Sequence, residues 1–124
     1  MVVCVVDDLI FSVKISTAAK ALGVDVYFER SPNNVLETVR QKQPRLAIFD
    51  LNSVRMQPLS VIAAMKADPA LKSIPTLGYV SHVQTEAIAA ARQAGIDRVL
   101  ARSAFSERIG DILSGTGERE LDLL

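Results

Sequence analysis

The chain has 124 residues, and its 14 basic side chains balance 14 acidic ones. This length predicts a single domain that buries roughly two-thirds of the surface exposed by the unfolded chain. Zero net charge excludes a broad electrostatic attraction to nucleic acid or to an anionic membrane, and no apolar run approaches the ~18 residues of a membrane span.

Short apolar segments rich in Val, Ile and aromatic residues alternate with longer segments of helical spacing. Strands that are apolar throughout are typical of a parallel sheet covered on both faces. The predicted strands are residues 1–6, 24–28, 45–50, 74–80 and 97–101. Cys4 is expected to be a buried side chain of the first strand, and as the only cysteine it suits a reducing, cytoplasmic setting.

Five helices are expected to alternate with these strands. The first carries apolar residues at helical spacing from Phe11 to Leu22 and ends at Gly23. The second has Ser31 as its N-cap and Pro32 at its first helical position. The remaining three are predicted over residues 58–67, 85–95 and 104–113.

This alternation predicts an α/β fold of the flavodoxin-like, doubly wound (βα)5 type. We expect a parallel five-stranded sheet in the order 2-1-3-4-5 with helices on both faces. Ligands of such sheets bind beyond the carboxyl ends of the strands, beside the switch point between the first and third strands. The residues that end those two strands are therefore the candidate site.

Acidic residues end both strands: Asp7 and Asp8 follow the first, and Asp50 ends the third. At about 4 Å and an effective dielectric constant of about 20, each like-charged pair costs about 4 kcal/mol, so the cluster requires a protonated carboxylate or a cation. Oxygen donors without His or Cys suit Mg²⁺. The alternative is that Asp7 and Asp8 only begin a helix, where acids complement the helix dipole.

Three stretches, VVCVVDD, LAIFDLN and AGIDRVLARSAF, resemble the receiver domain of two-component response regulators, over residues 1–114. The resemblance implies that Asp50 is the phosphoacceptor and that Asp7 and Asp8 are the acidic pair. It also implies weak Mg²⁺ binding by these three residues and the backbone carbonyl of Asn52. The protein would not be an enzyme beyond phosphoryl transfer to its own Asp50, and its partner would be a histidine kinase or another signalling protein.

The pattern departs from the family after the last strand. Arg102 occupies the position where the family has a lysine. An arginine can also donate hydrogen bonds to a phosphoryl oxygen. The alternative is that Arg102 is only an exposed side chain at a strand end. Ser103 replaces a proline that follows a cis peptide bond. Because a cis bond before a non-proline residue costs about 2.5–4 kcal/mol, we expect a trans bond here and a reshaped loop.

The fourth strand and the path of the signal also differ from the family pattern. Val80 occupies the usual place of a hydroxyl residue, and a bulge at Gly78 would bring Ser81 into register, so we assign the hydroxyl role to Ser81. The alternative is that Ser81 is a polar loop residue. Val99 replaces the aromatic residue that normally carries the signal, and the loop LNSVRMQP after Asp50 lacks the usual Met-Pro. These changes predict a degenerate receiver.

Several functions remain compatible with this sequence. The leading interpretation is a single-domain receiver-like signalling module that is phosphorylated on Asp50 with Mg²⁺. The departures favour an alternative, a pseudo-receiver that binds proteins without phosphorylation. A flavin- or nucleotide-binding protein is disfavoured because no glycine-rich phosphate loop follows the first strand. A small Mg²⁺-dependent phosphohydrolase lacks support from a cap domain or a second catalytic motif.

Residues 115–124 are expected to form a flexible C-terminal tail that is too short for an output domain. Its leucines could instead dock on a partner or on a second copy of the chain, which would make a homodimer. These leucines are Leu121, Leu123 and Leu124. At the other end, Asp7 and Asp8 interrupt the apolar stretch that a secretory signal needs, so we expect a cytoplasmic protein.

Overall fold

The structure of the protein, a computed structural model, describes residues 1–81, 84–115 and 123–124. The strands are β1 (Val2–Val5), β2 (Val26–Phe28), β3 (Leu46–Asp50), β4 (Thr76–Val80) and β5 (Arg98–Ala101). The helices are α1 (Leu9–Leu22), α2 (Val35–Lys42), α3 (Pro58–Ala67), α4 (Thr85–Ala94) and α5 (Arg102–Ser114), with a 3-10 turn, η1 (Pro32–Asn34), before α2.

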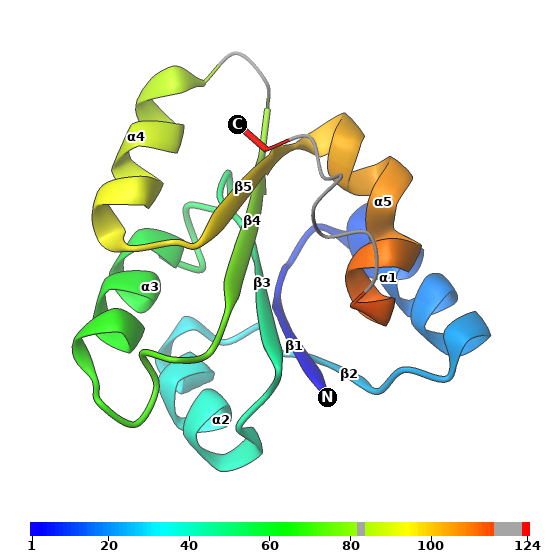
Figure 1. Cartoon of the computed structure of the whole chain (residues 1–124), viewed down its shortest axis with the longest axis horizontal. Helices are drawn as coiled ribbons and strands as arrows, with labels where there is room; N and C mark the ends of the chain where they lie inside the picture. The colour runs from blue at the N-terminus through cyan, green and yellow to red at the C-terminus, as the bar shows by residue number, and fades with distance from the viewer. Residues whose placement is uncertain (82–83, 116–122) are drawn as a thin grey trace.

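The five strands form one parallel sheet in the order β2-β1-β3-β4-β5. Helices α1 and α5 cover one face, and α2, α3 and α4 cover the other (Figure 1). The predicted fold class, strand order and placement of helices on both faces are confirmed. None of the helices in the described part of the chain is long and apolar enough to cross a membrane.

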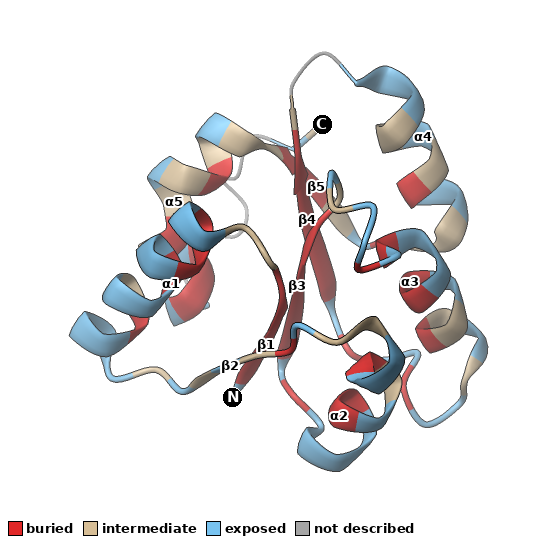
Figure 2. Ribbon diagram, turned by 180° about the vertical axis from the view of Figure 1, so that it is seen from behind, coloured by how far each residue is buried: buried red, intermediate tan, exposed pale blue. Residues whose placement is uncertain are grey.

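The central strands are buried along their whole length, as Figure 2 shows in red. Alternate side chains enter two separate cores: Cys4 and Ile48 lie in the core under α1 and α5, whereas Val3 and Phe49 lie in the core under α2, α3 and α4. Both faces of each strand need apolar side chains, which explains the continuous apolar runs of the sequence.

The N-terminus of α1 is capped as its sequence suggests. The Asp8 side chain accepts a hydrogen bond from the Phe11 N–H (3.1 Å), and Gly23 ends the helix in the left-handed region (φ 68°). The view that Asp8 begins a helix is therefore correct for this residue. This cap does not exclude a second role for the Asp8 carboxylate.

The second helical segment begins where the sequence predicts, with Ser31 in the N-cap position and Pro32 at the first helical position, but its first turn is a 3-10 turn. Ser31 makes no side-chain cap; its N–H donates to Glu29 (3.2 Å), and its carbonyl accepts from Asn34 (3.0 Å). This spacing of three residues makes a 3-10 turn, so α2 itself begins only at Val35.

One expectation about the fourth strand is wrong. The register runs without a break from Ala47↔Thr76 to Asp50↔Tyr79, so no bulge at Gly78 shifts Ser81 into the place of Val80. Gly78 is instead required by packing, because a Cβ there would lie 2.8 Å from the Leu51 side chain. The peptide bond before Ser103 is trans, as expected, and helix α5 starts at Arg102, immediately after β5.

The last residues of the chain return to the edge of the sheet. Leu123 forms an antiparallel bridge with Leu100 of β5, and the Leu124 N–H donates to the Val99 carbonyl (2.8 Å). Leu121 lies outside the described residues. The boundary between a domain of residues 1–114 and a tail of residues 115–124 stays a prediction.

Candidate functional site

Asp50 closes β3 at the carboxyl edge of the sheet and is 7% exposed. One carboxylate oxygen accepts a hydrogen bond from the Asn52 N–H (2.9 Å). Burial raises the pKa of Asp50, the Asn52 hydrogen bond opposes this shift, and the negative charges of Asp8 and Asp7 raise the pKa further. The three carboxylates therefore lie close enough to repel one another, as the strand order predicted.

Asp8 is held from two sides. Besides capping α1, its carboxylate lies 2.6 Å from the Arg102 guanidinium. The same guanidinium stacks over the Phe11 ring, 4.5 Å from its centroid. Because Arg102 is the first residue of α5, this ion pair ties the N-termini of α1 and α5 together at the edge of the acidic cluster. The sequence predicts that Arg102 contacts a phosphoryl oxygen; in this structure its guanidinium contacts Asp8 instead.

Asp7 also has a cationic partner. Arg55 Nε lies 3.1 Å from the Asp7 carboxylate, and Arg55 Nη2 donates to the Arg30 carbonyl (2.6 Å). Sequence reasoning missed this contact. Its only signal was a basic residue five positions after Asp50 in the same loop, which says nothing of where the side chain reaches.

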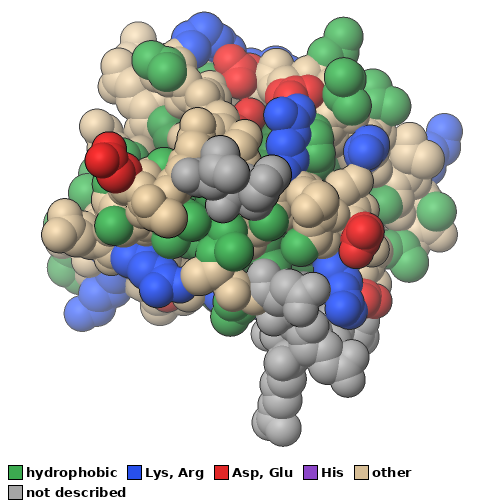
Figure 3. All heavy atoms as spheres, turned by 90° about the horizontal axis from the view of Figure 1, so that it is seen from above, with side chains coloured by type: hydrophobic (Ala, Val, Ile, Leu, Met, Phe, Trp, Pro, Cys, Tyr) green, Lys and Arg blue, Asp and Glu red, His purple; other side chains and the backbone are tan. Residues whose placement is uncertain are grey.

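The two arginines supply much of the positive charge that the acidic cluster requires. Figure 3, which views the molecule from above, shows acidic side chains beside a basic one. In the described ranges, no three side chains of the His, Cys, Asp or Glu type form a group that could hold a metal ion. The acids thus share one edge of the sheet without forming a ready-made three-carboxylate site.

Asn52 links the loop after β3 to the end of β4. Its side-chain oxygen accepts from the Ser81 N–H (3.0 Å), and its amide nitrogen donates to Gln84. Ser81 therefore lies at the margin of the acidic cluster, two strands away from Asp8. It also lines an open hollow of about 420 Å³ together with Phe11, Lys14, Arg102, Ser103 and Ser106.

Comparison with protein-family models gives no match, and no curated protein matches in sequence. Solved structures do match in fold. A response regulator from Hahella chejuensis aligns with a TM-score of 0.80 at 21% identity, over 91% of each chain. A chemotaxis response regulator of Vibrio cholerae aligns with a TM-score of 0.77 at 18% identity, over 92% of this chain and 95% of the other.

A third match is the receiver domain of a sensor histidine kinase from Pseudomonas aeruginosa, described with a magnesium ion coordinated in its active-site cleft. It aligns with a TM-score of 0.75 at 16% identity, over 93% of this chain and 97% of the other. The chain therefore has the fold of response-regulator receiver domains.

Proposed function

We propose that this protein is a receiver-type signalling module in which Asp50 accepts a phosphoryl group. The observation that carries the proposal is the position of Asp50 at the end of β3, beside Asp7 and Asp8, in a chain with the receiver fold. A histidine kinase or another signalling protein would supply the phosphoryl group.

The chemistry follows from the position of the carboxylate. Asn52 N–H fixes one oxygen of Asp50 through its hydrogen bond, so the other oxygen is the attacking atom. It forms a bond to the phosphorus of a phosphohistidine or a small acyl phosphate, while the bond from phosphorus to the donor breaks and the donor departs with the electron pair. The protein contributes mainly position and charge, which suits a site with few other reactive groups.

Magnesium fits the donor atoms of the site. Mg²⁺ binds through one or two carboxylates and retains several waters, so it needs no group of three acids. Asp8, Asp50 and the Asn52 carbonyl would hold it, with Asp7 acting through water. Burial raises the pKa of Asp50, and the negative charges of Asp8 and Asp7 raise it further; this unfavourable environment for a third negative charge is the physical reason for a cation here. When bound, Mg²⁺ would neutralise the carboxylates that face an anionic donor.

The arginines set the strength of this metal site. Because Arg102 lies 2.6 Å from Asp8, and Arg55 lies 3.1 Å from Asp7, a metal ion competes with two ion pairs that are already formed. We therefore propose weak binding. Once Arg102 leaves Asp8, its guanidinium can contact a phosphoryl oxygen on Asp50, and the Ser81 hydroxyl is the second group assigned to that phosphoryl group.

The same ion pairs favour a second candidate, a pseudo-receiver that binds its partner without phosphorylation. In that case Arg55 and Arg102 are permanent substitutes for the metal, and Asp50 stays an unmodified buried carboxylate. The signalling partner would then recognise the surface of the folded domain alone.

Mass spectrometry after incubation with Mg²⁺ and acetyl phosphate separates the two candidates. The proposal predicts the mass gain of one phosphoryl group in the wild-type chain and none in Asp50→Asn. If the wild-type chain gains no mass under conditions where calorimetry shows Mg²⁺ bound, Asp50 is not an acceptor and the pseudo-receiver interpretation replaces it.

A further inference from the structure

Tyr79 of β4 carries the one buried side-chain N or O atom that lacks a hydrogen-bond partner in the described part of the chain. The residue is 1% exposed. A buried hydroxyl without a partner loses its hydrogen bonds to water and gains none in return, so such groups are rare and need a reason. A phenylalanine would fill the same space without that cost.

The position of Tyr79 suggests the reason. Tyr79 is the register partner of Asp50 on the neighbouring strand, so both side chains leave the sheet on the same face, the one under α1 and α5. Burial raises the pKa of the Tyr79 hydroxyl, and the charges of Asp50 and Asp8 raise it further. The phenol therefore stays protonated, as a donor, within the electrostatic field of the acidic cluster.

Two neighbouring rings fix where this donor lies. The Tyr79 ring stacks on Phe11 with a centroid distance of 4.9 Å and on Phe105 with a centroid distance of 4.6 Å. Phe11 and Phe105 also pack against each other, with a centroid distance of 6.0 Å, so the three rings form one cluster that keeps the Tyr79 oxygen in place while the O–H bond can still rotate. A donor positioned before its acceptor arrives is the arrangement that stabilises developing anionic charge most effectively.

The neighbouring residue of β4 offers no side-chain donor of its own. The unbroken register leaves Val80 at the place where the receiver pattern has a hydroxyl, and Ser81 falls beyond the end of the strand. We propose that the Tyr79 hydroxyl is the strand-4 hydrogen-bond donor of this site, reserved for an anionic oxygen of the group that Asp50 carries. This inference rests on the proposed function, because it assigns Tyr79 to the phosphoryl group on Asp50 or to a mimic of that group.

The chain offers a matched pair of variants, because it has two tyrosines and no tryptophan. Tyr79→Phe removes only the buried hydroxyl, and Tyr27→Phe removes the hydroxyl of a half-exposed tyrosine on β2, at the far edge of the sheet. The probe is beryllofluoride with Mg²⁺, a non-covalent mimic of a phosphorylated aspartate. Calorimetry measures its affinity, and urea denaturation measures the stability of each variant.

The proposal predicts that Tyr79→Phe weakens beryllofluoride binding by about tenfold or more, the loss expected for a hydrogen bond to a charged group. The midpoint of urea denaturation should stay the same or rise, since an unpaired buried hydroxyl is removed. Tyr27→Phe should change neither quantity. In the wild-type protein and in Tyr27→Phe, adding beryllofluoride should shift the near-ultraviolet tyrosine absorbance, and this shift should disappear in Tyr79→Phe.

Three results would overturn the assignment, and they have different meanings. Equal beryllofluoride affinity in Tyr79→Phe and the wild type means that the hydroxyl only fills the core, while the proposed function stands. A lower midpoint of denaturation together with weaker binding means that Tyr79 supports the fold instead of the anion. Absence of binding to the wild type removes the proposed function and this inference together.

Discussion

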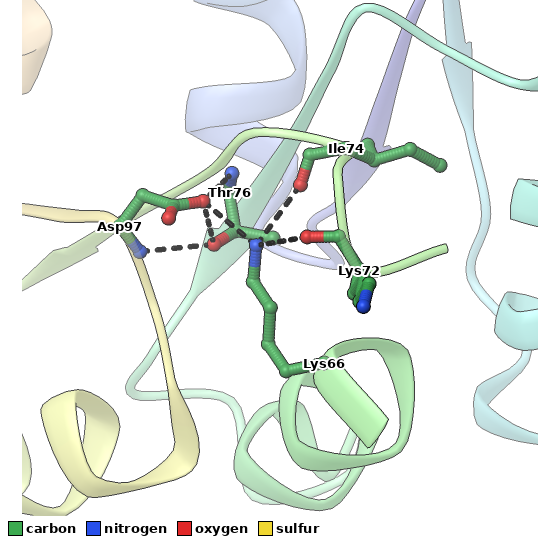
Figure 4. A network of polar contacts seen from close by, with 5 residues as sticks. All are labelled: Lys66, Lys72, Ile74, Thr76 and Asp97. Carbon is green, nitrogen blue, oxygen red and sulfur yellow. Dashed lines mark hydrogen bonds and ion pairs between the residues drawn. The ribbon is translucent and has the colours of Figure 1, made fainter. Parts of the chain in front are cut away.

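At the amino ends of β4 and β5, Lys66, Thr76 and Asp97 form a closed polar network, whereas at the carboxyl ends of β1 and β3 three carboxylates gather around two arginines. Figure 4 shows the first of these regions. Lys66 Nζ donates to the carbonyls of Lys72 (3.2 Å) and Ile74 (3.1 Å) and lies 2.9 Å from the Asp97 carboxylate. All the donors of this ammonium group thus have acceptors.

Asp97 completes the network with equally good pairing. Its carboxylate accepts from the Thr76 N–H (2.8 Å) and the Thr76 hydroxyl (2.9 Å), and its own N–H donates back to that hydroxyl (3.0 Å). Partial burial alone would raise the pKa of Asp97, but the hydrogen bonds from Lys66 and Thr76 outweigh it and hold the pKa below its ordinary value. The charged form is the stable one.

At the opposite end of the sheet, the charges and hydrogen-bonding groups are not fully paired. There the pKa of Asp50 is raised and the Tyr79 hydroxyl lacks a partner. A region that is fully paired can only stabilise the fold, whereas a region with excess negative charge and an unused donor can gain energy by binding something. From the contrast between the two ends we expect function at the carboxyl edge and a contribution to stability at the amino edge.

The largest effect on stability is expected at the amino edge. Asp97→Ala removes the acceptor of the fully buried Thr76 N–H, and an unpaired buried donor costs about 2 kcal/mol of the free energy of unfolding. Urea denaturation measures this loss. As a control, Asp111→Ala breaks an exposed pair with Arg108 at 3.9 Å and should change the free energy by less than about 0.5 kcal/mol. A similar small change in both variants would show that the network does not stabilise the fold.

Removing a carboxylate from the acidic cluster should raise the stability of the fold instead of lowering it. In chelator at neutral pH, Asp50→Asn should raise the melting temperature by several degrees, since about 1 kcal/mol corresponds to roughly 4 °C in a domain of this size. The pKa of Asp50 is raised on folding, so the carboxylate lowers stability as pH rises above its ordinary value of 3.8. The advantage of Asp50→Asn should therefore shrink as the solution is acidified toward that value.

The contribution of Asp97 to stability should change with pH in the opposite direction to that of Asp50. Because the pKa of Asp97 is lowered on folding, its stabilisation is present above the ordinary value of 3.8 and is lost as pH falls below it. Melting curves of Asp50→Asn and Asp97→Asn across acid and neutral pH should therefore differ from the wild type with opposite signs. Parallel curves for the two variants would contradict the contrast between the two ends of the sheet.

A smaller effect is expected from Arg102. Arg102→Gln releases Asp8 from its 2.6 Å ion pair, so Mg²⁺ should bind a few times more tightly by calorimetry, while stability falls by about 1 kcal/mol or less and depends on salt. Arg108→Gln, a change elsewhere on α5, is the control and should leave Mg²⁺ affinity unchanged. Unaltered affinity in Arg102→Gln would mean that the arginine does not compete with the metal.

The smallest effect is expected at the edge of β5. Removing Leu123 and Leu124 breaks the hydrogen bond to the Val99 carbonyl and the bridge to Leu100. We expect a change of less than about 0.5 kcal/mol in the free energy of unfolding, with NMR shifts confined to β5. A loss as large as that of Asp97→Ala would make these two residues part of the folding unit.

The sequence was sufficient to predict the sheet, because strands buried on both faces must be apolar and helices must alternate with them. It also predicted that Asp7, Asp8 and Asp50 would share one edge, since the strand order places the ends of β1 and β3 side by side. These inferences use only the period and order of the elements.

The rest of the site depended on register and loop geometry. Arg55 reaches Asp7 only because of the path of the loop after β3, and Tyr79 lies beside Asp50 only because β4 has no bulge. Arg102 contacts Asp8 because α5 starts at once after β5. Such details depend on small differences in packing that residue patterns do not encode.

NMR of the uniformly ¹⁵N-labelled protein, with and without beryllofluoride and Mg²⁺, most directly tests the contrast between the carboxyl edge and the amino edge of the sheet. We expect shifts for residues 51–58, Tyr79, Ser81 and Thr85, with little change at Thr76 and Asp97 and little along residues 104–113. Helix α5 should stay nearly unchanged because Val99 lies in the other core and offers no aromatic ring to rotate. Absence of any shift, or shifts that extend along residues 104–113 and reach Asp97, would contradict this expectation.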